Sequence, residues 1–132
     1  MTTYTDAQQT LPVQTEVDHG VLVATIHTKS LLYEMAINEI EECILEAMPR
    51  AQSALLVDCA ELTLHVSSQF LSMLVRVHRK AGESGLKMGI CNLSEALQMV
   101  YNVTALRSVL PAYHTRQQAV ADLGEFDSWE RR

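Results

Sequence analysis

The stretch from Ala54 to Ser84 constrains the fold of this chain more than any other segment. It begins with a short apolar run, Ala54–Cys59, interrupted only by Asp58, which is typical of a strand covered on both faces. A polar loop ends in Ser67 and Ser68, and from there apolar residues recur at helical spacing. The segment therefore predicts a buried strand, a short loop and a long amphipathic helix around which the other elements pack.

The predicted helix has a broad apolar stripe and one narrow polar face. The polar face consists of Ser72, Arg76, Arg79, Lys80 and Glu83. Ser67 or Ser68 is the expected N-cap, because a serine oxygen there accepts a hydrogen bond from an unpaired backbone N–H. Of the two, we expect Ser68 to make the capping bond and Ser67 to present its hydroxyl outward from the loop.

The remaining segments alternate between strand and helix patterns. Strands are predicted at 13–17, 21–27, 86–93 and 109–113, and helices at 31–48, 94–104 and 115–123. A turn is predicted at His19-Gly20, Tyr33 belongs to the inward stripe of the first helix, and Pro111 confines the last strand to a sheet edge. This order predicts an α/β fold with a mixed, mainly parallel β-sheet of four to five strands and four α-helices.

The chain is expected to form one domain at residues 13–123, preceded by a flexible arm at 1–12 and followed by a charged tail at 124–132. Trp129 is the tail residue expected to fold back onto the body. The polar N-terminus lacks the pattern of a secretory signal, and no apolar run approaches the roughly 20 residues of a membrane span. We therefore expect a cytoplasmic protein without membrane insertion.

Charge and cysteine usage exclude several functions. A net charge of −6 with only 10 Lys and Arg residues argues against nucleic-acid binding, which needs clustered cations. The three cysteines, Cys43, Cys59 and Cys91, lack metal-type spacing, and their odd number predicts reduced, buried thiols. No metal or other cofactor is expected. A triad of Asp58, His65 and Ser67 is excluded as well, since His65 and Ser67 share one short loop.

The central segment and its surroundings resemble the STAS domain of bacterial anti-sigma-factor antagonists. The resemblance runs over about 13–123 and rests on the strand LLVDCAEL, the loop HVSSQF and the helix LSMLVRVHRKAGESG. Downstream, GICNLSEALQMVYNVTALRSVLPAYHTRQQAVADL is similar to the family's strand, capped helix, edge strand and terminal helix. The family hallmark places Asp before the serines and Gly after them, where this chain has Val66 and Gln69.

The resemblance implies a non-enzymatic role in a partner-switching cycle. The expected partner is an anti-sigma factor with a histidine-kinase-like ATPase fold that acts as a serine kinase, and a serine phosphatase would complete the cycle. The resemblance aligns Ser67 with the phosphorylated serine and Ser68 with its neighbour. The residues expected at the partner surface are Asp58, His65, Val66, Ser67, Ser68, Gln69 and Ser72.

Alternative interpretations remain for individual residues and for the domain. Ser67 and Ser68 can be a plain cap and loop residue, and Asp58 can stabilise its loop by accepting backbone N–H bonds instead of binding a partner. The same fold also serves as an accessory subunit of membrane lipid transporters without a phosphorylation cycle, or as a sensor of a small ligand. Fold analogy alone does not separate these roles.

Overall fold

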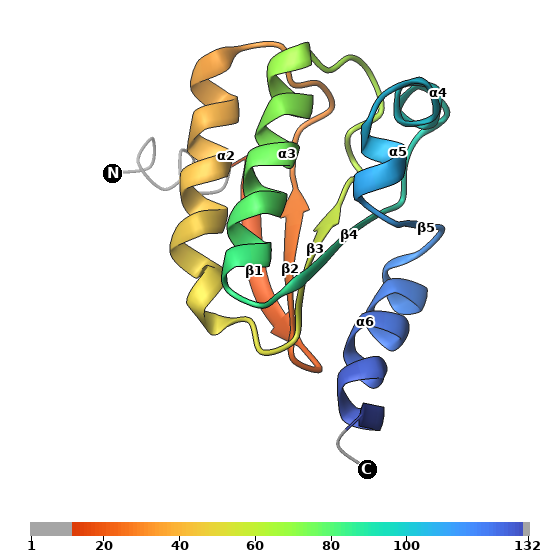
Figure 1. Ribbon diagram of the computed structural model, residues 1–132. Coiled ribbons are helices and arrows are strands. Elements are labelled where there is room, and N and C mark those ends of the chain that lie inside the picture. Colours follow the sequence, from red (N-terminus) through yellow and green to blue (C-terminus); the bar gives the residue numbers. More distant parts are fainter. Residues whose placement is uncertain (1–11, 131–132) are drawn as a thin grey trace, which may run out of the picture.

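The computed structural model describes residues 12–130, and the side chains among them up to residue 124. Five strands form one sheet in the order β1-β2-β3-β4-β5 (Figure 1). Their bounds are β1 Val13–Asp18, β2 Val21–Ile26, β3 Ala54–Asp58, β4 Lys87–Cys91 and β5 Ala112–Tyr113. β1 pairs antiparallel with β2, and the other neighbouring strands pair in parallel. The predicted mixed, mainly parallel sheet is confirmed.

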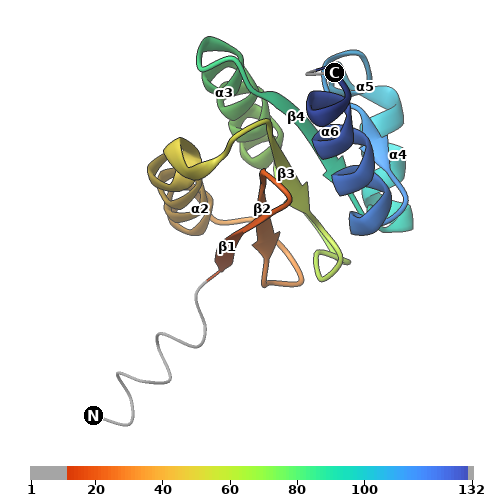
Figure 2. The same cartoon turned by 90° about the horizontal axis from the view of Figure 1, so that it is seen from below.

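Helices cover both faces of the sheet, as the alternating pattern predicts. They are α2 Glu34–Ala47, the short 3-10 turn η1 Met48–Arg50, α3 Ser68–Glu83, α4 Glu95–Val103, α5 Leu106–Val109 and α6 Arg116–Glu130. α2 and α3 lie side by side on one face, and α6 lies on the other (Figures 1 and 2). α4 and α5 pack beside the N-terminal half of α3.

Alternating side chains on the buried strands divide the core into two layers. On β2, Leu22, Ala24 and Ile26 face α2 and α3, whereas Val21 and Val23 face α6. On the α6 side these two valines meet Ala119, Val120 and Leu123 in a smaller cluster. Because side chains on a strand alternate between faces, a one-residue shift in register would exchange the two layers.

A two-residue turn joins β1 to β2 at the position predicted for it. His19 and Gly20 both have positive φ, 53° and 84°, and the pair Asp18 and Val21 closes the hairpin. Two positive φ values are those of a type I′ turn, whose twist matches the right-handed twist of the flanking strands. The hairpin supplies β1, which is the sheet's outer edge on that side.

The predicted starts of the first helix and of the last strand are wrong. The helix predicted at 31–48 begins only at Glu34, because Leu31 is fully enclosed in a contact between two loops, and Tyr33, predicted to face inward, is 77% exposed. Val109 ends helix α5 instead of opening a strand, and only Ala112 and Tyr113 after Pro111 pair with β4. The described residues therefore contain an additional helix, α5, besides the four predicted ones.

The last helix runs further than its sequence pattern indicates. Thr115 caps it as predicted, because the Gln118 N–H donates to Thr115 Oγ1 at 3.1 Å. The helix continues past Leu123 to Glu130, through part of the segment predicted as a charged tail. The predicted arm lies almost entirely outside the described residues, and so does the side chain of Trp129. Among the described residues, no helix is both long and apolar enough to cross a membrane.

The thiols offer a test of the core. All three cysteines are free, Cys59 and Cys91 are buried, and Cys43 is half-buried. Burial raises the pKa of Cys91 to about 12 and raises the pKa of the Cys59 thiol as well. Burial raises the pKa of the Cys43 thiol too, but its side chain is partly open to solvent, so we expect iodoacetamide to label only Cys43, and slowly, in the folded protein. Intact mass would show one slow addition before unfolding in urea and three after it.

The same thiols should make stability depend on alkaline pH. A thiol whose pKa is higher in the folded state stabilises the fold fully below the ordinary value of 9.0, and this contribution is lost as pH rises toward about 12. We therefore expect the melting temperature to fall over that range, and to fall less in a Cys59→Ala, Cys91→Ala double variant. An equal fall in both proteins would contradict this assignment.

Candidate functional site

Two loops join at the carboxyl edge of the sheet and create the most elaborate surface feature of the described chain. The Leu31 N–H donates to the His65 carbonyl at 2.8 Å, and the Ser67 N–H donates to the Leu31 carbonyl at 2.8 Å. A third bond, from the Leu64 N–H to the Lys29 carbonyl, is also 2.8 Å. Residues 29–31 and 64–67 thus form a short parallel ladder, here called the loop ladder, in which Leu31 pairs with Val66.

The loop ladder fixes Ser67 at the start of α3. Ser67 is the N-cap residue, with extended φ and ψ of −91° and 166°, and its carbonyl accepts the N–H of Phe70 at 3.1 Å. Its hydroxyl oxygen, however, is buried and has no hydrogen-bond partner. Buried polar atoms are nearly always paired, so an unpaired one requires an explanation.

The predicted division of labour between the two serines is wrong. Ser68 does not cap the helix, because it is the first helical residue and is exposed. Ser67 does not present its hydroxyl outward, because the ladder holds its backbone on Leu31 and places the hydroxyl beneath the surface. The sequence pattern locates the end of the helix correctly, but this long-range pairing decides which serine occupies the cap.

Asp58 supports the loop from inside. It is only 6% exposed, and its Oδ1 accepts the Ala60 N–H at 3.1 Å and the Asn92 side-chain amide at 2.9 Å. Asn92 stands directly after β4 with a positive φ of 59°, a conformation that Asn tolerates better than most residues. The loop-stabilising interpretation of Asp58 is therefore confirmed, and the buried carboxylate is not part of the accessible surface.

The other predicted partner residues lie at or near the surface around the ladder. His65, Ser68, Gln69 and Ser72 are exposed, and Val66 is half-buried through its pairing with Leu31. Ser72 belongs to the polar face of α3, as the helical pattern predicts. The structure thus brings these five residues to one end of α3, next to the loop that follows β2.

Sequence reasoning missed four exposed apolar residues beside the ladder. Leu32, Tyr33, Met35 and Leu64 are between 46% and 80% exposed, and we call them the apolar rim. Leu32 and Tyr33 follow the ladder residue Leu31, Met35 lies in the first turn of α2, and Leu64 belongs to the ladder itself. The available signal was the apolar run at the start of the predicted helix, which a 3.6-residue period cannot place entirely inside.

The side chain of His27 connects this edge of the sheet to the N-terminal hairpin. His27 Nδ1 lies 2.8 Å from Glu61 Oε2, and its Nε2 lies 3.2 Å from Gln14 Oε1. Glu61 belongs to the same loop as the ladder residues, and Gln14 belongs to β1. Among the described residues, no group of three or more His, Cys, Asp or Glu side chains is arranged to hold a metal ion.

Fold and site together define a small α/β domain whose elaborated surface is a loop-and-helix edge. The chain belongs to the STAS domain family, whose model matches residues 12–119. No curated protein matches the chain. The family assignment and the predicted fold class are thereby both confirmed.

Solved structures of anti-sigma-factor antagonists share this fold. A STAS domain protein of this kind from Planctomyces limnophilus is 25% identical with a TM-score of 0.75, covering 84% of this chain and 96% of that one. A variant of RsbS from Moorella thermoacetica is 18% identical with a TM-score of 0.69, covering 88% and 97%. The phosphorylated form of the Bacillus cell fate determinant SpoIIAA is 18% identical with a TM-score of 0.62, covering 83% and 97%.

The observed positions of Ser67 and Ser68 predict that replacing either serine hardly changes the free energy of unfolding. Ser67→Ala removes a hydroxyl that is buried and unpaired, so the free energy of unfolding should stay within about 0.5 kcal/mol of the wild type or rise. Ser68→Ala should also change it by less than about 0.5 kcal/mol, because Ser68 is exposed and is not the N-cap. Urea unfolding monitored by circular dichroism would measure both values.

Asp58→Ala provides the contrasting variant in the same experiment. It leaves the Ala60 N–H and the Asn92 amide without their acceptor, and we expect a loss of about 1–3 kcal/mol. If Ser68→Ala instead lowered the free energy of unfolding by about 1 kcal/mol, Ser68 would be a capping residue, which would contradict the structure.

Proposed function

We propose that this protein is an anti-sigma-factor antagonist that docks on an anti-sigma factor with serine kinase activity. In this proposal, phosphorylation of Ser67 releases the complex, and a serine phosphatase resets it. The domain contributes a binding surface and the phosphate acceptor, whereas the kinase supplies the catalysis and the nucleotide. The supporting observation is the unpaired hydroxyl of Ser67 at the N-terminus of a 16-residue helix.

The apolar rim is suited to forming the contact. Tyr33 and Met35 are 77% and 80% exposed, and covering them with a partner would remove their apolar surface from water. Exposed apolar side chains gathered beside a polar surface are typical of protein interaction sites. Exposed His65, Gln69 and Ser72 would form the polar border of the same contact.

The helix terminus is suited to a phosphate. The first N–H groups of α3 lack partners within the helix, and the helix dipole places partial positive charge there. A phosphoserine at the N-cap adds about −1.5 to −2 charges where those groups stabilise an anion. Phosphorylation at Ser67 is therefore compatible with the fold, although the new charge changes the surface that the partner contacts.

The buried hydroxyl adds a step before phosphorylation. A kinase needs the Ser67 oxygen at its surface, but the loop ladder holds it inside through the bond from the Ser67 N–H to Leu31. Docking on the apolar rim would act on the ladder itself, because the rim residue Leu64 belongs to it. Local opening of such a short pairing needs less free energy than global unfolding. In this proposal the kinase modifies Ser67 only after binding has opened the ladder.

Phosphorylation can be tested with purified candidate kinases. The wild-type protein would be incubated with ATP and, separately, with each serine-kinase anti-sigma factor encoded in the source genome. We expect one of them to add a single phosphate, which fragment mass spectrometry should place on Ser67. Ser67→Ala should bind that kinase without being modified, and Ser67→Asp should bind it more weakly because the added charge mimics part of the phosphate.

Ser68→Ala is the matched control, since it removes a neighbouring exposed hydroxyl and should be phosphorylated like the wild type. A phosphate on Ser68 or Thr63 would refute the assignment of Ser67. Binding without phosphorylation by any of these kinases would mean that Val66 and Gln69 mark a domain that has kept docking and lost the cycle.

The docking surface can be tested without phosphate. Ser72→Trp places a large side chain on the exposed polar face of α3, close to the loop ladder, and should weaken binding to the same kinase. The melting temperature should change little, since exposed substitutions usually alter stability by less than about 0.5 kcal/mol. Arg79→Trp, two turns further along this face, should leave binding intact. Equal weakening by both substitutions would argue against a contact confined to the N-terminal end of α3.

A further inference from the structure

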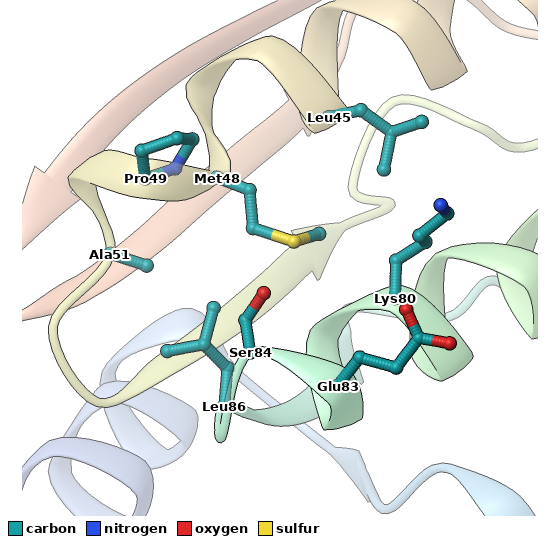
Figure 3. Close-up of a pocket in the computed structure, with 8 residues that line it drawn as sticks. All are labelled: Leu45, Met48, Pro49, Ala51, Lys80, Glu83, Ser84 and Leu86. Atoms are coloured by element: carbon teal, nitrogen blue, oxygen red, sulfur yellow. The ribbon is translucent and has the colours of Figure 1, made fainter.

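A hollow with a volume of about 600 Å³ lies between the ends of α2 and α3, far from the loop ladder. One wall consists of apolar side chains from α2, η1 and the residue after it, namely Leu45, Met48, Pro49 and Ala51, and Leu86, between α3 and β4, adds a further apolar side chain. The other wall is the last turn of α3, with Lys80, Glu83 and Ser84 (Figure 3). Met48 is only 6% exposed and forms the apolar floor. The volume lies within the range of small-molecule sites.

The way in which α2 and α3 align places no oppositely charged residue of α2 beside the two charged residues of the α3 wall, Lys80 and Glu83. One turn earlier, Arg76 donates to both carboxylate oxygens of Glu41 on α2, at 3.0 and 2.7 Å. Advancing four residues along each helix gives Lys80 on α3 and Leu45 on α2, so an apolar residue stands where a second acid would pair. Within the described residues, neither Lys80 nor Glu83 makes an ion pair.

We propose that this hollow binds a small zwitterion with an apolar side chain, of the class of aliphatic α-amino acids. The ligand carboxylate pairs with the Lys80 ammonium, and the ligand ammonium pairs with the Glu83 carboxylate. The aliphatic side chain lies against Met48, with Leu45 and Leu86 on its flanks. Lys80 and Glu83 are three residues apart on one helix, so they project from the same face at a separation that one amino-acid backbone can bridge.

The charge pattern selects this class over simpler ligands. A plain carboxylate would gain Lys80 but would also approach the negative Glu83, and a plain amine would meet the reverse conflict. An uncharged apolar molecule would leave both charges with water alone, and a zwitterion without a side chain would leave the floor uncovered. Only a ligand with both charges and an apolar body complements every part of the lining.

This inference is independent of the proposed function. Ser67 is the N-cap residue of α3, and the hollow lies at the C-terminal end of that helix, so none of the lining residues belongs to the loop ladder or the apolar rim. Failure of one proposal therefore leaves the other standing.

The proposal can be tested by titrating the full chain, labelled with ¹⁵N, with L-leucine while recording amide spectra. We expect saturable shifts confined to residues 45–51 and 80–86. Lys80→Met and Glu83→Gln should each raise Kd about threefold to fivefold, the upper part of the range of one solvent-accessible ion pair. Both residues are exposed, so the variants should keep the wild-type melting temperature. Arg79→Met removes a neighbouring exposed charge that does not line the hollow, and it should bind L-leucine as the wild type does.

Three analogues separate the parts of the ligand. 4-Methylpentanoate lacks the ammonium group, 3-methylbutylamine lacks the carboxylate, and glycine lacks the side chain, so each should bind more weakly than L-leucine. The proposal is overturned if L-leucine causes no saturable shift, if glycine binds as tightly, or if Lys80→Met and Glu83→Gln leave Kd unchanged.

Discussion

The pairing of the loops after β2 and β3 is the constraint on which the functional edge depends. Its three backbone bonds, each 2.8 Å long, enclose Leu31 and fix where α3 begins. They also determine that Ser67 is the cap residue and that its hydroxyl is buried without a partner. A short pairing that leaves a polar atom unpaired stores a local cost, and such costs concentrate at functional edges.

Polar contacts between the strand ends and the loop after β3 hold this edge of the sheet in position. Asp58 joins the end of β3 to the residue after β4 by accepting the Asn92 amide, and it holds the loop through the Ala60 N–H. The contacts of His27 with Glu61 and Gln14 connect the same loop to β1. The contacts of Asp58 are partly buried and those of His27 are exposed, and together they hold the loop that carries the ladder.

α3 connects two chemically different ends of the molecule. Its first turn adjoins an apolar rim and a buried hydroxyl, whereas its last turn presents two opposite charges, which form no ion pair within the described residues, to a hollow with an apolar floor. Between them, the bidentate contact of Arg76 with Glu41 holds α3 against α2. A rigid helix packed in this way is able to carry two separate sites without either one requiring the other.

The sequence by itself determined the elements that depend on local pattern: the buried strand 54–58, the amphipathic α3, the Thr115 cap and the His19-Gly20 turn. Hydrophobic periodicity and the residue preferences of turns depend on only a few neighbouring residues, so they can be recognised in the sequence. Only the tertiary structure decided that Ser67 and not Ser68 is the N-cap residue of α3, that Tyr33 faces outward, and that Lys80 and Leu45 line the same hollow. Each of these depends on contacts between segments more than 30 residues apart, and such contacts cannot be predicted from the spacing of residues within one segment.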